Sequence, residues 1–320
     1  MLSDLRPLCG GLVRIYLLAE SAEVIALFKS LWPEDEVAWS VFSSGKDLLD
    51  HLFHEPPHIL VAALHSRDLD GMEVLHVVSS DNIYRQICAI LIIDTPSSLD
   101  ENWEEEPVFA DFIALPISLD VLRLRIALAL RRSISALDAN PLTHLPGNSS
   151  IIQSIQGYVN KKIDFALVYA DIDNFKSFND KYGFSRGDEA LLMSARLIAT
   201  TVGALEAQPC FVGHVGGDDF IFILPIDQVE DVCKKLIKAY DEIVPSFYDE
   251  EDRRRGFITA ADRQGVLQTY PLLSLSLAVV INKDARFSHF GEMSYIAGQV
   301  KRKAKQTQGS CYVIDRRSHT

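Results

Sequence analysis

The stretch of sequence at residues 211–224, FVGHVGGDDFIFIL, decides the fold of the second half of the chain. Two apolar runs of strand length flank the central Gly216-Gly217-Asp218-Asp219. Because glycine reaches positive φ without steric cost, this spacing predicts a β-hairpin. The turn of the hairpin therefore presents the carboxylates of Asp218 and Asp219 at its tip.

A further strand is expected beside this hairpin. Residues 165–170 form an apolar run, and the polar segment that begins Asp171-Ile172-Asp173 follows it. If this strand pairs with the hairpin, the carboxylates of Asp171 and Asp218 converge on one edge of the sheet. Mg²⁺ is usually held by one or two carboxylates while substrate phosphates complete its octahedron. This edge is therefore a candidate Mg²⁺ site.

The first half of the chain alternates between expected strands and expected helices. The strands are short apolar runs, and the helices carry apolar residues at three-and-four spacing. Such alternation predicts a parallel, doubly wound sheet, which places ligand sites at the carboxyl ends of its strands. The expected strands are 12–18, 59–64, 89–93 and 112–115, and the expected helices include 20–31 and 119–132.

Composition limits the classes of function. The 320 residues are 48% apolar and 23% charged, which is enough for two domains with separate cores. A formal net charge of −13 argues against nucleic acid and anionic membranes as partners. The five cysteines form no CxxC pair, no apolar run is long enough to span a bilayer, and the first residues lack a signal-peptide pattern. A soluble protein of the reducing cytoplasm is expected.

The expected domains are 1–132 and 148–320, with the end of a connecting helix and a linker at 133–147. The connecting helix carries one apolar stripe, which leaves two interpretations open with equal weight. The stripe pairs with its copy in a second subunit, or it packs on its own sheet. Its members are Leu119, Leu122, Ile126, Leu130, Ile134 and Leu137.

Two motifs of the first domain, DLDGMEVL at 68–75 and LPISLD at 115–120, resemble the receiver domain of two-component response regulators, a CheY-like fold. The resemblance implies an acidic pair for Mg²⁺, an aspartate that accepts a phosphoryl group, and a lysine. The corresponding positions hold Ala19 with Glu20, Ala63 and Leu115. Alanine has no oxygen to phosphorylate, and Asp68 and Asp70 are expected to form turns. We interpret the domain as a pseudo-receiver, meaning a receiver without phosphorylation chemistry, which serves dimerisation or docking of a protein partner.

The second half resembles the GGDEF domain of diguanylate cyclases, an α/β domain with a palm-like, nucleotidyl-cyclase-like central sheet. Such enzymes join two GTP molecules into cyclic di-GMP, with one nucleotide on each subunit of a homodimer. Any one of the matching motifs is weak, but together they are specific. They are LTHLP at 142–146, DID at 171–173, GDE at 187–189, GGDDF at 216–220, 273–279 and Ala304-Lys305.

The resemblance implies a role for each residue that matches a family motif. The metal ligands would be Asp171, Asp218 and the carbonyl of Ile172. The catalytic set would be Asp218, Asp219 and Lys176, because phosphoryl transfer needs mainly positioning and charge stabilisation.

The nucleotide would be GTP or cyclic di-GMP. Asn179 and Asp188 would hydrogen-bond the guanine edge, and such a site rejects adenine because adenine leaves those groups unpaired. Lys176 and Lys305 would neutralise the triphosphate.

The sequence also departs from the family pattern. The signature tetrad ends in Asp219 rather than glutamate, Phe184 replaces a histidine, and Ser310 stands where an arginine is expected. Residues 207–210 lack the Arg-x-x-Asp motif of the inhibitory product site. Residues 246–265 read as an insertion, expected to be an exposed loop.

Two classes of function therefore compete. The favoured hypothesis is a cyclic di-GMP signalling protein whose variant domain binds guanine nucleotide or a partner and is impaired or inactive as a cyclase. The alternative is an active homodimeric diguanylate cyclase. A DNA-binding regulator is disfavoured because no basic helix-turn-helix follows the first domain.

Overall fold

The computed structural model describes residues 12–66, 68–81, 83–94, 109–261, 267–315 and 317, without the side chains of Leu137 and Ala261. The chain divides into two compact units, Met1–Leu137 and Asp138–Thr320. The sequence predicts that the first domain ends at residue 132 and that the second begins at residue 148. The first unit is longer because the last helix of the first domain continues to Asp138.

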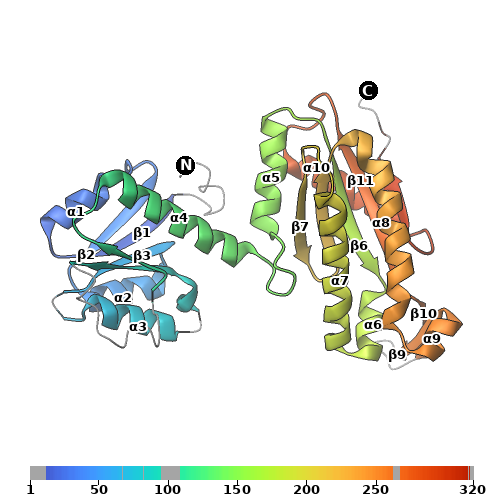
Figure 1. Ribbon diagram of the computed structural model, residues 1–320, viewed down its shortest axis with the longest axis horizontal. Helices are drawn as coiled ribbons and strands as arrows, with labels where there is room; N and C mark the ends of the chain where they lie inside the picture. The colour runs from blue at the N-terminus through green and yellow to red at the C-terminus, as the bar shows by residue number, and fades with distance from the viewer. Residues whose placement is uncertain are drawn as a thin grey trace. The chain divides into compact units, whose positions relative to one another are not determined.

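The first domain is a parallel, doubly wound α/β fold, as the sequence predicts (Figure 1). Its sheet has the order β2-β1-β3-β4-β5, with every described pair parallel. The strands are β1 Val13–Leu18, β2 Val37–Phe42, β3 Ile59–Ala63, β4 Cys88–Ile93 and β5 Asp111–Ala114. The helices are α1 Ala22–Lys29, α2 Gly45–His54, α3 Gly71–Ser80 and α4 Leu119–Asp138. Helices α1 and α4 pack on one face of the sheet, and α2 and α3 pack on the other.

Helix α4 packs on its own sheet through the apolar stripe. Leu122, Ile126, Leu130 and Ile134 are buried in the core between α1, α4 and the sheet. Leu119 is exposed, and the side chain of Leu137 lies outside the described part. The interpretation of this stripe as a subunit contact is therefore wrong, because its burial within one domain already satisfies it. A second apolar row on α4, made of Val121, Leu124 and Leu128, is exposed.

The two aspartates after β3 are structural in this fold. Asp68 accepts hydrogen bonds from the backbone nitrogen of Gly45 and the hydroxyl of Ser44, at 2.8 and 2.9 Å. Asp70 is the N-cap of α3 and accepts from the nitrogen of Glu73 at 2.8 Å. A hollow of about 450 Å³ at the carboxyl ends of the strands is lined by Ala63, Leu115 and other side chains. No side chain at these two positions can accept or neutralise a phosphoryl group.

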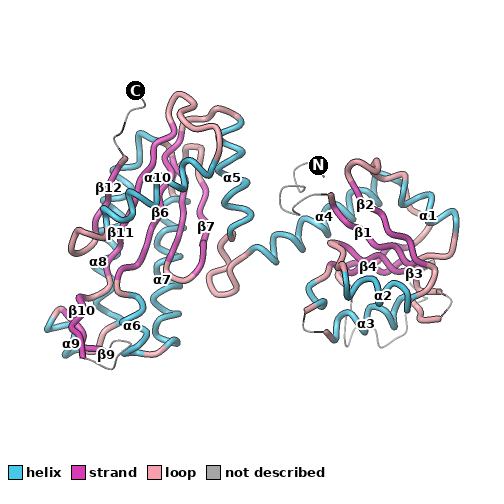
Figure 2. Tube along the Cα trace, turned by 180° about the vertical axis from the view of Figure 1, so that it is seen from behind, coloured by secondary structure: helices cyan, strands magenta, loops and turns pink. Residues whose placement is uncertain are grey.

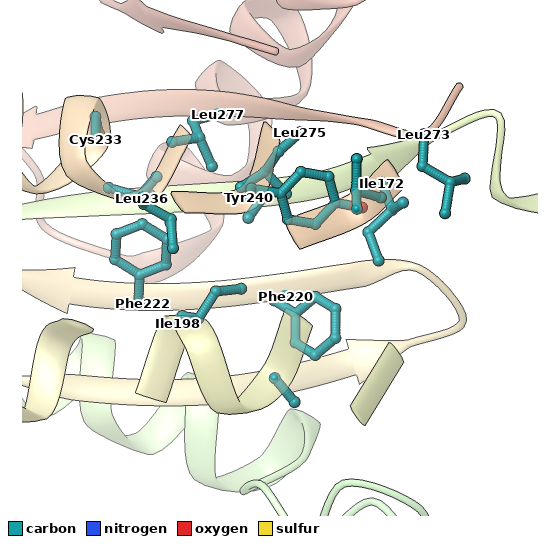
Figure 3. Close-up of a cluster of buried hydrophobic side chains, with 14 of the residues drawn as sticks. Ile172, Ile198, Phe220, Phe222, Cys233, Leu236, Tyr240, Leu273, Leu275 and Leu277 are labelled. Atoms are coloured by element: carbon teal, nitrogen blue, oxygen red, sulfur yellow. The ribbon is translucent and has the colours of Figure 1, made fainter. Parts of the chain in front are cut away.

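The second domain has a mixed five-stranded sheet of order β12-β11-β6-β8-β7 (Figures 1 and 2). Its strands are β6 Phe165–Asp173, β7 Phe211–Gly216, β8 Asp219–Leu224, β11 Ser274–Asn282 and β12 Cys311–Ile314. Its helices are α5 Asn148–Asn160, α6 Phe175–Tyr182, α7 Phe184–Gly203, α8 Val229–Ile243 and α10 Phe290–Ala304. One core lies between the sheet and α7 and α8 (Figure 3), and a second lies between the sheet and α5 and α10.

The start of helix α5 is capped by a side chain that precedes the helix in the sequence. The Asp138 carboxylate accepts hydrogen bonds from the backbone nitrogens of Gly147, Ser149 and Ser150, at 2.8–3.1 Å. These nitrogens have no partner within the helix, so the carboxylate stabilises its start.

The described residues of the insertion are folded rather than a loop, although most of them are exposed as expected. The insertion contains α9 Glu250–Arg255 and β9 Phe257–Ala261, and β9 pairs antiparallel with β10 Leu267–Pro271, which follows the insertion. Tyr248 and Asp252 are buried, and Asp252 contacts both Lys181 and Tyr182 of α6. These contacts hold the insertion against α6 (Figure 1). Residues 262–265 lie outside the described part.

Among the described residues, none of the helices combines the length and apolar content required to cross a membrane.

Candidate nucleotide and metal site

The sheet brings the carboxylates of Asp171, Asp218 and Asp219 together. Strand β6 pairs antiparallel with β8 so that Asp171 stands opposite Asp219. The backbone nitrogen of Ile172 donates to the Asp218 carbonyl at 3.2 Å, which ties the hairpin turn to the same strand. One ligand oxygen from each aspartate lies within 4.8 Å of the others. Three hard oxygen donors at this spacing fit Mg²⁺.

Asp171 lies within β6 rather than after its end, which the sequence did not predict. The strand continues to Asp173 because β11 pairs with it along this whole stretch, with Ser276 opposite Asp171. The Asp173 carboxylate accepts from the hydroxyls of Ser274 and Ser276, at 3.1 and 2.6 Å. Asp173 therefore stabilises the strand pair beside the site.

Two lysines from α10 neutralise part of this charge. The Lys305 ammonium lies 2.7 Å from one carboxylate oxygen of Asp171, and the Lys301 ammonium lies 2.6 Å from the other. Lys301 also contacts Asp219. The sequence predicts Lys305 at this site but assigns no role to Lys301. Its spacing of four residues from Lys305 is the signal that places both on one side of the helix.

The cluster shifts the pKa of each member in a definite direction. Burial alone would raise the pKa of Asp171, but hydrogen bonds from Lys301 and Lys305 outweigh it and lower that pKa. Burial and the neighbouring Asp171 charge raise the pKa of Asp218. Burial also raises the pKa of Asp219, even though Lys301 partly offsets the effect. Asp171 is therefore the firmly ionised member.

His214 braces the hairpin behind these carboxylates, and the sequence did not single it out. Its ring stacks on Phe220 with centroids 4.3 Å apart. Its nitrogens lie 2.9 Å from the Thr143 hydroxyl and 3.0 Å from the Gly217 carbonyl. Burial lowers the pKa of His214, so the neutral ring fixes the turn that carries Asp218.

The residues predicted to read guanine lie around α6 and the start of α7. The Oδ1 atom of Asn179 is buried and has no hydrogen-bond partner within the part of the chain that the structure describes. The adjacent Gly187 is buried, and a Cβ atom at that position would overlap Asn179 Oδ1. Asp188 is exposed near the start of α7, just after the first turn, which begins at Phe184. An acceptor left open in this way suits the N–H donors of a base.

Three other positions that the sequence singles out do not belong to the carboxylate cluster. Lys176 is exposed on the first turn of α6, and among the described residues it makes none of the ion pairs of the carboxylate cluster. Phe184 is 79% exposed. The Ser310 hydroxyl lies 2.9 Å from the backbone nitrogen of Leu275 and donates to Asp241. Ser310 thus has a structural role where the family pattern expects an arginine.

Comparison with known proteins matches the second domain to a family. A family model described as "Diguanylate cyclase, GGDEF domain" matches residues 138–254. The second domain is a GGDEF domain. The matched range covers the hairpin and α6, so it includes the three carboxylates and Asn179.

Several curated proteins resemble part of the chain. The bifunctional diguanylate cyclase/cyclic di-GMP phosphodiesterase MucR of Pseudomonas aeruginosa is 30% identical over 129 residues, which is 38% of this chain and 18% of MucR. The diguanylate cyclase DgcP of Escherichia coli is 28% identical over 173 residues, or 51% of this chain and 47% of DgcP. The chain thus spans less than half the length of these relatives.

Solved structures show the same likeness at lower identity. The GGDEF domain of DgcB from Caulobacter crescentus, determined in complex with c-di-GMP, is 18% identical. The match covers 55% of this chain and 95% of that one, with a TM-score of 0.41.

Proposed function

We propose that this protein is a cyclic di-GMP signalling protein whose GGDEF domain binds a guanine nucleotide with Mg²⁺ and turns GTP over slowly or not at all. The observation that supports it is the cluster of three carboxylates and two lysines on one sheet edge, together with the open acceptor of Asn179. Carboxylates would hold the metal, lysines would neutralise phosphates, and Asn179 with Asp188 would select guanine.

The contacts of Asp219 and the serine at position 310 favour impaired catalysis. Asp219, the shortened acid of the tetrad, is engaged by Lys301. The Ser310 hydroxyl is already hydrogen-bonded to Leu275 and Asp241. Serine also lacks the positively charged guanidinium with which an arginine binds a phosphate through two hydrogen bonds. Lys176 and Lys305 remain as the predicted contacts of the triphosphate.

The alternative is an active homodimeric diguanylate cyclase, and the intact set of Asp171, Asp218 and Lys305 favours it. In that case the 3′-hydroxyl of each GTP attacks the α-phosphorus of the other, so that two phosphodiester bonds form, two pyrophosphates leave and the two hydroxyl protons pass to solvent. Asp171 and Asp218 would hold Mg²⁺, which would polarise the phosphate oxygens, and the lysines would stabilise the charge of the departing pyrophosphate.

Incubation of the purified protein with GTP and Mg²⁺, followed by chromatography of the nucleotides, tests the proposal. We expect GTP to be bound but recovered intact, with an Asp218→Ala variant that binds it more weakly. Cyclic di-GMP formed by the unmodified protein and lost in Asp218→Ala would establish the active cyclase instead. No GTP binding by either protein would leave partner docking as the function of the domain.

The first domain supplies a surface for the homodimer that we propose. Val121, Leu124 and Leu128 form an exposed apolar row along α4, with three-and-four spacing. The retained sheet and helix surfaces allow a pseudo-receiver to serve dimerisation or docking without a phosphorylation site. We place the protein in the cytoplasm, where GTP is available and the described cysteines, which are free, remain reduced.

Replacement of Leu124 by glutamate tests this surface. A charge in the middle of the row should weaken dimerisation at least tenfold, because burying an unpaired carboxylate is costly. Ile83→Glu is the control, since Ile83 is an exposed apolar residue elsewhere in the first domain. Sedimentation equilibrium gives the dissociation constants. Equal constants for Leu124→Glu and the unmodified protein would exclude this row from the interface.

A further inference from the structure

Lys301 occupies an unusual position among the carboxylates. Its ammonium touches two of the three aspartates, lying 2.6 Å from Asp171 and in contact with Asp219. The Lys301 side chain is 23% exposed, and the Asp171 side chain is 3% exposed. A lysine side chain is ordinarily charged at neutral pH, and two carboxylates face this one.

The two lysines of α10 differ in how they meet the site. Lys305 approaches Asp171 alone and is 44% exposed, so it lies at the rim. Lys301 joins the facing strands β6 and β8 through the registered pair Asp171 and Asp219. A cation that used oxygens of both aspartates would meet the same atoms as the Lys301 ammonium. Two like charges cannot share those oxygens at close range without strong repulsion.

We propose that the Lys301 ammonium is a built-in counter-ion of the carboxylate site, which a divalent cation must displace. The proposal rests on the proposed function only in taking Asp171, Asp218 and Asp219 as metal ligands. A bare Mg²⁺ competes with a tethered cation that is always present. It also pays its own dehydration cost, which is high for this ion. The empty domain should consequently bind divalent cations weakly.

A nucleotide changes this balance. The triphosphate brings oxygens of its own, which can accept from the Lys301 ammonium and draw it away from Asp171 and Asp219. The carboxylates are then open to the metal, and phosphate oxygens complete its coordination. Nucleotide and divalent cation should therefore bind cooperatively, each raising the affinity for the other by the same factor. The lysine thus makes the site selective for the metal–nucleotide complex over either component alone.

Titration of the full chain with Mn²⁺, followed by electron paramagnetic resonance of the free ion, tests this without nucleotide or turnover. We expect Lys301→Met to bind Mn²⁺ at least tenfold more tightly than the unmodified protein. Lys303→Met removes the same charge from an exposed position of the same helix and should change the affinity less than twofold. Lys301→Gln also removes the charge but keeps a polar side chain, and it should bind Mn²⁺ as tightly as Lys301→Met. Agreement between these two variants shows that a folding defect of Lys301→Met does not cause the effect.

A second titration in the presence of GTP measures the cooperativity. In the unmodified protein GTP should tighten Mn²⁺ binding by at least tenfold more than it does in Lys301→Met. If Lys301 serves only as a phosphate ligand, its loss weakens GTP binding and leaves the affinity for free Mn²⁺ unchanged, which overturns the inference. If no variant binds Mn²⁺ under any condition, the metal site of the proposed function fails along with it.

Discussion

Replacement of Asp171 by alanine is expected to lower the affinity for GTP in the presence of Mg²⁺ by at least about a hundredfold, or roughly 2.7 kcal/mol. Asp171 is the central member of the site, because it pairs with both Lys301 and Lys305 and faces Asp219 across the strands. It is also the carboxylate that the lysines keep ionised. Its loss would remove one of the proposed metal ligands and free two ammonium groups from their partner.

Isothermal titration with GTP, with Mg²⁺ and again with EDTA, measures this effect. Most of the loss should appear only with Mg²⁺, since the carboxylate acts through the metal. Asp180→Ala is the control, because Asp180 is an exposed carboxylate on α6. Circular dichroism confirms that both variants are folded. A folded Asp171→Ala protein that binds Mg²⁺ and GTP normally would remove this edge of the sheet from the nucleotide site.

Substitution of Gly187 by alanine is expected to reduce the affinity for GTP by about tenfold or more, and to reduce the preference for GTP over ATP. A Cβ atom at position 187 would overlap Oδ1 of Asn179. The amide must then turn away from the position from which it is proposed to bind the guanine edge. The loss of one recognition hydrogen bond, with its buried partner left unpaired, costs about 1–3 kcal/mol.

Gly157→Ala provides the matched control for this experiment. Gly157 also lies within a helix, α5, and a Cβ atom there meets nothing within 4 Å. This change should leave GTP binding intact and stabilise the domain by about 0.5–1 kcal/mol, because alanine favours the helix. Competition of GTP and ATP against a fluorescent guanine nucleotide reports the preference. An unaltered preference in Gly187→Ala would mean that Asn179 does not read the base.

Local patterns were sufficient for much of the architecture. The glycine pair at Gly216 and Gly217 predicted the hairpin, and the structure places both at positive φ. The alternation of short apolar runs with helical spacing predicted the parallel sheet of the first domain. These signals are reliable because turn geometry and hydrophobic periodicity act over a few residues. The fold of the insertion was missed because α9 carries charged, mostly exposed side chains and is held through the contacts of Asp252 with α6, far back along the chain.

The sequence by itself determined the fold class and the family of the second domain, and it predicted the residue types of a candidate site. Only the tertiary structure decided which interactions those residues make. The antiparallel pairing of β6 with β8 brings Asp171 opposite Asp219, and the packing of α10 places Lys301 between them. Likewise, the sheet of the first domain buries one row of α4 and leaves Val121, Leu124 and Leu128 exposed. The physical reason is that strand register and helix docking depend on contacts between residues distant in the chain, which no local pattern encodes.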